Sequence, residues 1–368
     1  MAGLGALATV RGSFTLNGLA SLQNVSGLGA LTTVGSPGAV ASLYIASNPA
    51  LTDVTLAGLQ TVTGAIGFES DQALTDAALP ALTSVGTSGL PDGFSGSLVF
   101  NVLATLNNVD LRSLATTPSN VQFSTIGSQA LGSMTTNFAS LTTVNGTLNF
   151  TSVANLENMI GFGALATVRG SFTLNTLGML ANVAGLDALA TVGAPGAAAS
   201  LYIANNATLT DVTLSALQTV TGAIGFESDQ GLTNAALPAL TSVGTAGLPD
   251  GFSGSLLFNV LPNLTNVDLP DLASTPSNVQ VSTCGAKAAA HLVLDLSALT
   301  TDNGFLFLSA VTNLFDLNGL AELVAVCGSV TITTDTNLPT STASGLLAQL
   351  ASVTCKGTPT TISGDQAD

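Results

Sequence analysis

Residues Leu31–Val54 read LTTVGSPGAVASLYIASNPALTDV and contain the pattern that decides the fold. The stretch begins with Leu-x-x-Val, passes through Ser42–Ala46 (SLYIA) and ends with Leu-x-Asp-Val. Alternation of polar and apolar residues, as in SLYIA, is typical of a strand with one buried face. The same three-part pattern returns about every 23 to 32 residues, which predicts a solenoid of stacked coils and not a globular enzyme fold.

A longer duplication lies over this short repeat. Gly5–Gly12 (GALATVRG) returns as Gly163–Gly170, so the offset is 163 − 5 = 158 positions. We therefore divide the chain into a first copy at 1–160, a second copy at 161–286, and final coils with a C-terminal cap at 287–368. Together they are expected to form one continuous solenoid of about 13 coils.

A repeat unit this short cannot bury a core of its own. Its Leu, Ile, Val and Phe side chains leave water only when the next coil stacks against them. The fold class predicted is therefore all-β, a parallel β-helix. Ala343–Ser352 has the apolar spacing of a helix instead, and we expect it to cover the open edge of the last coil.

The pattern Leu-x-x-Val-x-Gly-x-Leu-x-Ile…Asn-x-x-Leu resembles the receptor L-domain and related leucine-rich-repeat-like proteins. Leu7–Val25 and Leu31–Val54, with Asn48 inside the latter, carry the resemblance, which extends over nearly the whole chain. It implies a right-handed, leucine-rich-repeat-like solenoid. It implies little about function, because members of that family bind hormones, other proteins, glycans or each other.

Enzymatic activity is not expected. Pectate-lyase-like β-helices, the enzymes nearest in shape, need carboxylates clustered with Arg or Lys on one face. The only basic residues here are scattered: Arg11, Arg112, Arg169, Lys287 and Lys356. His291 is the only histidine, which excludes a histidine-based triad or zinc cluster, and we interpret it as a surface residue of a late coil.

The net charge of −16 excludes a basic groove for nucleic acid and disfavours anionic membrane surfaces. No apolar run reaches the roughly 18 residues of a membrane span. Cys327 and Cys355 are candidates for a disulfide that fixes the C-terminal cap, with Cys284 left over, and this favours an extracellular location. The sequence opens directly into a repeat unit without a recognisable signal peptide, so we expect a trimmed fragment.

One column of polar residues recurs at the third place of Leu-x-Asn/Asp-Val. We interpret it as an inward structural ladder that satisfies backbone groups and stacks from coil to coil, with a row of calcium ligands as the alternative. Its members are Asn24, Asp53, Asp76, Asn108, Asn158, Asn182, Asp211, Asn234, Asn266 and Asp316.

A second column occupies the third place of Leu-x-Thr-Val and is named the Thr/Ser column. Regularly spaced hydroxyl and methyl groups suit either a ladder that tightens coil packing or a face that orders water for ice binding. Its members, the candidate binding face, are Thr9, Thr33, Thr61, Ser84, Thr143, Thr167, Thr191, Thr219, Ser242 and Thr301.

Two further features are repeated in both copies. The acidic pair Glu69/Asp71, repeated as Glu227/Asp229, suits a solvated turn, with calcium binding as the alternative. The insertion at residues 86–96 (GTSGLPDGFSG), repeated at 244–254, is expected to project from one face, where such loops often carry binding.

These observations predict a non-enzymatic extracellular or cell-surface solenoid for binding, adhesion or scaffolding, without a cofactor. Its partner would be a protein or glycan, bound through loops and aromatic residues such as Tyr44 and Tyr202. The first alternative is an ice-binding protein that uses the Thr/Ser column. The second is a filament subunit that associates through the ends of the solenoid.

Overall fold

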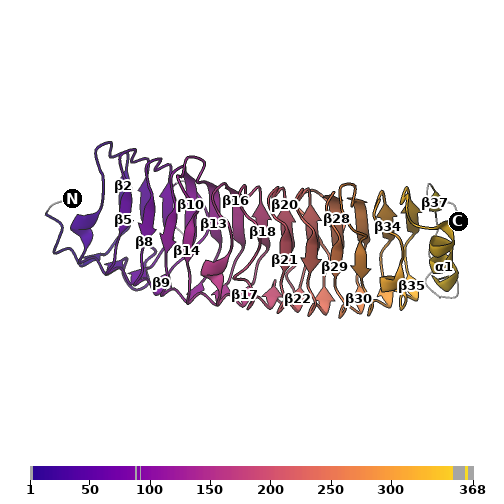
Figure 1. The fold of residues 1–368 in the computed structure, drawn as a ribbon. Helices are drawn as coiled ribbons and strands as arrows, with labels where there is room; N and C mark the ends of the chain where they lie inside the picture. The colour runs from indigo at the N-terminus through magenta and orange to yellow at the C-terminus, as the bar shows by residue number, and fades with distance from the viewer. Residues whose placement is uncertain (1–2, 88, 92, 351–360, 364–368) are drawn as a thin grey trace. The chain divides into compact units, whose positions relative to one another are not determined.

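The computed structural model describes residues 3–87, 89–91, 93–350 and 361–363. The chain divides into two compact units, the first made of Met1–Leu180 with Ala184–Ala188, the second of Ala181–Val183 with Leu189–Asp368. Each unit is a parallel β-solenoid whose coils contribute up to three short strands (Figure 1). The predicted fold class is thus confirmed, with about 12 turns where about 13 were expected. The right-handed sense stays a prediction.

The strands of the first unit stack in three rows. Row A holds β1 (Thr9–Val10), β3 (Thr33–Val34), β6 (Thr61–Val62), β9 (Ser84–Val85), β12 (Thr116–Thr117), β15 (Thr143–Val144) and β17 (Thr167–Val168). Row B holds β2 (Phe14–Asn17), β4 (Leu43–Ala46), β7 (Ile66–Glu69), β10 (Leu98–Leu103), β13 (Val121–Ile126), β16 (Leu148–Val153) and β18 (Phe172–Asn175). Row C holds β5 (Asp53–Thr55), β8 (Asp76–Ala78), β11 (Asn108–Asp110) and β14 (Thr135–Asn137).

The second unit repeats the three rows. Row A holds β19 (Thr191–Val192), β22 (Thr219–Val220), β25 (Ser242–Val243), β30 (Ser274–Thr275), β33 (Thr301–Asp302) and β35 (Ala325–Val326). Row B holds β20 (Leu201–Ala204), β23 (Ile224–Glu227), β28 (Leu256–Leu261), β31 (Val279–Cys284), β34 (Leu306–Ser309), β36 (Val330–Thr333) and β37 (Thr361–Ser363). Row C holds β21 (Asp211–Thr213), β24 (Asn234–Ala236), β29 (Asn266–Asp268) and β32 (Val293–Asp295).

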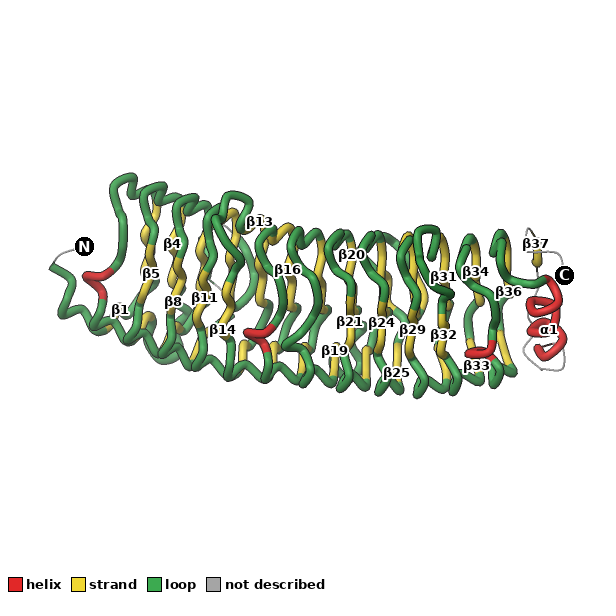
Figure 2. Tube along the Cα trace, viewed as in Figure 1, coloured by secondary structure: helices red, strands yellow, loops and turns green. Residues whose placement is uncertain are grey.

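Short helices interrupt this regularity (Figure 2). The 3-10 helices η1 (Ser26–Leu28), η2 (Ile160–Phe162) and η3 (Asn318–Leu320) each follow the third Leu-x-Asn/Asp element of a coil. The only α-helix among the described residues, α1, spans Thr340–Leu350. The predicted helix therefore exists and begins three residues earlier than expected, while Ser352 lies outside the described residues. No helix in the described part of the chain is long and apolar enough to cross a membrane.

Successive coils bury the side chains that alternate inward along their strands. In β4, for example, Leu43 and Ile45 are fully buried, and both pair in register with Ile66 and Phe68 of β7. The Leu and Val of the Leu-x-x-Val elements, such as Leu31 and Val34, are also fully buried. The interior is thus built from the repeated apolar positions of the sequence, as the stacking argument requires.

The corner after row B has a backbone conformation that the sequence did not reveal. One residue that is not glycine has a positive φ near 55° at nearly every row B strand, either directly after the strand or one position before its last residue. These residues are Ser47, Ser70, Val102, Thr125, Ser152, Thr176, Asn205, Ser228, Val260, Thr283, Ala310 and Thr334. They form six pairs at the 158-residue offset, the last being Thr176 and Thr334, so the periodicity continues beyond position 286. Positive φ is unfavourable for such residues, and the stacked coils must impose it.

Candidate functional site: the Thr/Ser column

The Thr/Ser column lies on the outer surface of row A. In the Leu-x-Thr-Val elements from Leu31 to Val243 the Leu and Val are buried, so the Thr or Ser between them points outward. Thr33 and Thr61 are half-exposed and Ser84 is exposed, whereas Val34 and Val62 are fully buried. The orientation that the sequence left open is therefore resolved: these side chains face solvent.

Parallel pairing holds the column in register. In the first unit Thr9 pairs with Thr33, Thr33 with Thr61, and Thr61 with Ser84. In the second unit Thr219 pairs with both Thr191 and Ser242. Hydrogen-bonded neighbours place successive hydroxyl groups about 4.8 Å apart. The column is thus a regular line of small polar groups in each unit.

A hydroxyl ladder does tighten the coils, but it uses the residue before the column. The hydroxyl of Thr32 donates to the backbone oxygen of Ala8 at 3.0 Å, and that of Thr83 donates to the backbone oxygen of Gln60 at 3.2 Å. Thr142, Thr241 and Thr300 make the same bond to the preceding coil. The column residues themselves make no side-chain hydrogen bond to any residue that the structure describes. Their hydroxyl groups are therefore available to water or to a ligand.

The sequence pattern missed two members of the column. Thr116 pairs with Thr143, and Ser274 pairs with Thr301, so both occupy column positions. Each is followed by a buried Thr, Thr117 or Thr275, where the pattern requires Val. A search that accepted Thr at the buried position would have found them. In the last coil of row A, Ala325 stands in the column.

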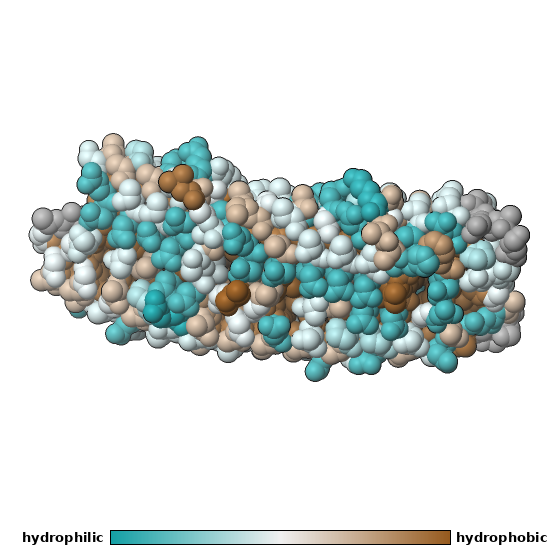
Figure 3. Space-filling model, viewed as in Figure 1, coloured by the Kyte–Doolittle hydropathy of each residue, from teal (hydrophilic) through white to brown (hydrophobic). Residues whose placement is uncertain are grey.

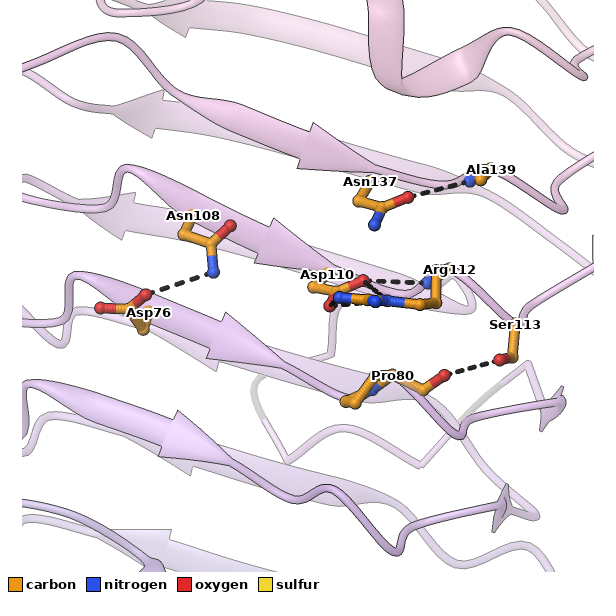
Figure 4. Close-up of polar contacts among 8 residues, drawn as sticks. All are labelled: Asp76, Pro80, Asn108, Asp110, Arg112, Ser113, Asn137 and Ala139. Atoms are coloured by element: carbon orange, nitrogen blue, oxygen red, sulfur yellow. Dashed lines mark hydrogen bonds and ion pairs between the residues drawn. The ribbon is translucent and has the colours of Figure 1, made fainter.

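The Asn/Asp column lies on the outer face of row C, and its predicted inward orientation is wrong. Asp53 and Asp76 are half-exposed and Asn24 is exposed, because Val54 and its equivalents fill the interior. The stacking is nonetheless present: Asn108 Nδ2 donates to Asp76 Oδ1 at 3.2 Å (Figure 4). In the second unit Asp211, Asn234 and Asn266 form a continuous chain of such bonds, each of 2.7 Å.

Where a 3-10 helix follows, the column residue instead accepts the first backbone N–H of that helix. Asn158 Oδ1 accepts from Ile160 at 3.2 Å, and Asp316 Oδ1 accepts from Asn318 at 3.0 Å. Hydrophilic side chains accordingly gather over the row C strands (Figure 3). Asn182 is another predicted member of the Asn/Asp column. It forms a parallel bridge with Asp211 inside the second unit.

In the pair Glu69/Asp71 the two acidic residues lie on opposite sides of the strand layer. Glu69 ends β7 on the outer face, while Asp71, beyond the corner at Ser70, is fully buried. Asp71 Oδ1 accepts the backbone N–H of Asn48 at 2.6 Å, and burial raises the pKa of Asp71 to about 6. Burial likewise raises the pKa of Asp229 to about 7. No cluster of three or more metal-ligating acids, histidines or cysteines occurs in the described part of the chain.

The repeated insertions fold back onto the solenoid, which corrects the expectation that they project. We name residues 86–96 the first strap and residues 244–254 the second strap. Leu90 of the first strap packs on Tyr44, Ala65 and Val99 of the outer row B face, with Phe94 beside it. In the second strap, β26 (Ala246–Gly247) and β27 (Ser253–Gly254) form an antiparallel pair; Leu248 and Phe252 make the equivalent contacts.

The straps remove the two tyrosines from any direct role as exposed binding aromatics. Tyr44 and Tyr202 are only 7% and 5% exposed. The hydroxyl of Tyr202 donates to Glu227 Oε2 at 2.8 Å, and burial followed by this hydrogen bond raises the pKa of Tyr202. Gly225 lies beneath the strap, where an added Cβ would come 2.3 Å from a methyl carbon of Leu248. The strap and the strands below it are therefore one packed unit.

The cysteines and the histidine are placed as follows. Cys284 is a free, buried thiol, and burial raises its pKa to about 12. Cys327 is disulfide-bonded, whereas its predicted partner, Cys355, lies outside the described residues. His291 is exposed in the second unit, and its ring stacks on that of Phe315.

The comparisons with known proteins found nothing similar. No protein-family model, no curated protein and no solved structure matches the chain.

Proposed function

We propose that the chain is a non-enzymatic extracellular binding solenoid that recognises a regularly repeating surface through the Thr/Ser column, and that this surface is ice. One observation carries the proposal. The column presents outward hydroxyl groups in register, at the strand spacing, and no described residue engages them. A ligand with its own lattice can meet many such weak contacts at once.

The chemistry of the face supports this function. Around Thr33, Thr61 and Ser84 the Leu-x-Thr-Val elements and their immediate neighbours contain no charged residue. The preceding hydroxyl groups, such as that of Thr32, are fixed to the backbone of the neighbouring coil. The strands therefore hold the column rigidly, which lowers the entropy lost on binding.

The wider class, a binding or adhesion module resembling the leucine-rich-repeat-like L-domains, remains part of the proposal. The sequence predicts that such a module binds through loops and exposed aromatic residues. The packed straps weaken that prediction, since Tyr44 and Tyr202 are covered. The Thr/Ser column therefore becomes the preferred face, while the strap surfaces become secondary.

Thermal hysteresis and ice-crystal shape, measured at micromolar protein, test the proposal. We expect faceted crystals with the natural sequence. Thr61→Tyr, in the middle of the first unit's column, should abolish faceting because a large ring separates the neighbouring hydroxyl groups from a flat lattice.

Thr135→Tyr is the matched control. Thr135 is also an exposed outward threonine on a paired strand, but it belongs to row C. Faceting should survive this change. Round crystals with the natural sequence, or equal loss of faceting in both variants, would refute ice binding through the column.

A further inference from the structure

A shallow pocket of about 380 Å³ opens on the second unit, at the corner between β31 and β32. The corner loop that runs from Gly285 to His291 forms one side. Thr312, Phe315 and Asn337, from the two following coils, form the other. The volume lies within the range of small-molecule sites in proteins. The pocket is on a corner and is separate from the Thr/Ser column of row A.

Two stacked aromatic rings form the lip of the pocket. The ring centroids of His291 and Phe315 are 3.6 Å apart, and their planes differ by 14°. His291 is exposed and Phe315 is half-buried, so the histidine ring is the outer member of the pair. A stacked pair of this kind presents the flat face of its outer ring beside polar groups.

The floor of the pocket is rigid. Asn313 is 6% exposed, and its Nδ2 donates to the backbone oxygens of Leu264 at 2.8 Å and Ala290 at 3.0 Å. Gly285 packs directly on this amide: an added Cβ would come 1.7 Å from Asn313 Oδ1. The asparagine thus ties three successive coils together, and the pocket is formed before any ligand arrives.

The walls are polar but carry no carboxylate. Thr312 supplies a hydroxyl group and Asn337 a side-chain amide, whose Nδ2 donates to the backbone oxygen of Thr312. None of the lining residues is Asp or Glu, in a chain with 21 acidic residues. The site can therefore offer both donors and acceptors to a neutral ligand.

The first unit has the same frame without the aromatic rings. Gly127 and Asn155 stand 158 positions before Gly285 and Asn313, and the Asn155 amide makes the equivalent two bonds, to Leu106 and Gly132. Ser133 and Glu157, however, occupy the places of His291 and Phe315. The frame is thus structural, and the aromatic pair is specific to the second unit.

We propose that this pocket binds a pyranose residue of a neutral glycan. Such a ring has an apolar C–H face, which fits the flat surface of the His291–Phe315 pair, and a rim of hydroxyl groups, which fits Thr312 and Asn337. The net charge of −16 favours a neutral glycan over an acidic one, which the chain would repel.

The chain itself provides a probe of the site. Because His291 is the only histidine, its imidazole C–H signal in an NMR spectrum reports on this pocket alone. Titration with cellohexaose, mannohexaose and maltohexaose should shift that signal saturably for at least one sugar. If none of the three moves the signal at millimolar concentration, the proposal is overturned.

A pair of exchanges between the units supplies the second test. His291→Ser with Phe315→Glu gives the second unit the residues of the first, so the fold should tolerate it. The affinity for the bound sugar, measured by calorimetry, should fall by about tenfold or more. The first unit also has Ala154 and Met179 in the places of Thr312 and Asn337, so Ser133→His, Ala154→Thr, Glu157→Phe and Met179→Asn together should create a second site. If the first variant keeps both its affinity for the sugar and its melting temperature, the His291–Phe315 pair does not bind the sugar and the proposal is overturned. Thr61→Tyr is the control and should leave sugar binding unaltered.

Discussion

The 158-residue offset continues past residue 286 and relates the first unit to the second, and we call these two units the first and the second copy from here on. They fill equivalent core positions with different side chains. In the first, Phe123 stacks on Phe150 at 4.6 Å, Phe138 stacks on Phe162 at 4.7 Å, and edge-to-face contacts join the two pairs. At the 158-residue offset these four positions hold Val281, Leu296, Leu308 and Leu320, all buried. None of the four phenylalanines has an aromatic equivalent in the second copy. The difference teaches that these four rings pack on one another and differ as a set, whereas Phe100, which stacks on Phe123 at 4.7 Å, has an equivalent in Phe258, which pairs with Val281.

The outer surface shows the opposite behaviour at the straps. Tyr44, Glu69 and Leu90 have identical equivalents in Tyr202, Glu227 and Leu248, and both straps make the same contacts. The solenoid thus accepts a repacked interior while it retains a surface cover. Stacked coils explain the first point, since each coil needs only to match its two neighbours.

Breaking the phenylalanine cluster should produce the largest effect. Phe150→Ala should cost about 3–5 kcal/mol of local stability, because it removes a buried ring and leaves a cavity beside Phe123 and Phe162. Leu308→Ala, the matched change in the second copy, should cost about 2–5 kcal/mol and less than Phe150→Ala. Amide hydrogen exchange in β16 and β34 measures each cost where it arises.

Replacing the whole cluster should sharpen the same comparison. The fourfold variant Phe123→Val, Phe138→Leu, Phe150→Leu and Phe162→Leu recreates the interior of the second copy. Its loss of stability should be smaller than the sum of the four single losses, since these residues are in contact and their effects are coupled. Strictly additive losses would mean that the four rings are independent.

The sequence predicted the regular parts of the molecule and failed where neighbouring coils decide the outcome. Repeat length and alternation were sufficient to predict a parallel solenoid with a C-terminal helix. The column at Thr61 was found because its elements keep Leu and Val, and Thr116 was missed because a buried Thr replaces Val. The strap contact of Leu90 joins a loop to coils that precede and follow it, and no local pattern encodes such a contact.

The second copy also contains a buried carboxyl group that the first copy lacks. Asp302 stands where the first copy has Val144, both fully buried, and it accepts the hydroxyl of Thr275 at 2.8 Å. Burial raises the pKa of Asp302 from 3.8 to about 6. A folded pKa above the unfolded value means that the contribution of this group to stability is fully present below about pH 4 and is lost as the pH rises through 6.

The effect of Asp302→Val on the free energy of unfolding should therefore be more favourable at pH 8 than at pH 4. The difference between the two pH values should be on the order of 2–3 kcal/mol, since each pKa unit corresponds to about 1.4 kcal/mol. Thr275 can then bond within its own corner, as Thr117 does with the backbone oxygen of Ser119 at 3.0 Å. Thermal melts from pH 4 to 8 measure the change. Asp71 and Asp229 have raised pKa values too, so a weaker decline with pH should remain in the variant. An identical pH profile in variant and natural chain would contradict the assignment.

The smallest expected effect concerns charges on row C. In the first copy Arg112 forms an ion pair with Asp110, which pairs in register with Asn137. In the second copy Asp268 instead pairs in register with Asp295, and burial followed by the charge of Asp295 raises the pKa of Asp268. The first copy thus has a carboxylate neutralised by an arginine, whereas the second copy has two adjacent carboxylates that repel each other.

Asp295→Asn gives the second copy the amide that the first copy has at this place. It should raise stability by under about 0.5 kcal/mol, because Asp268 is only half-buried and solvent screens the repulsion. The gain should disappear in 1 M salt, where the screening length is about 3 Å. Melting temperatures at low and high salt provide the measurement, with Asn137→Asp as the reciprocal variant. A gain that persists in high salt would assign the difference to hydrogen bonding by the amide and not to charge.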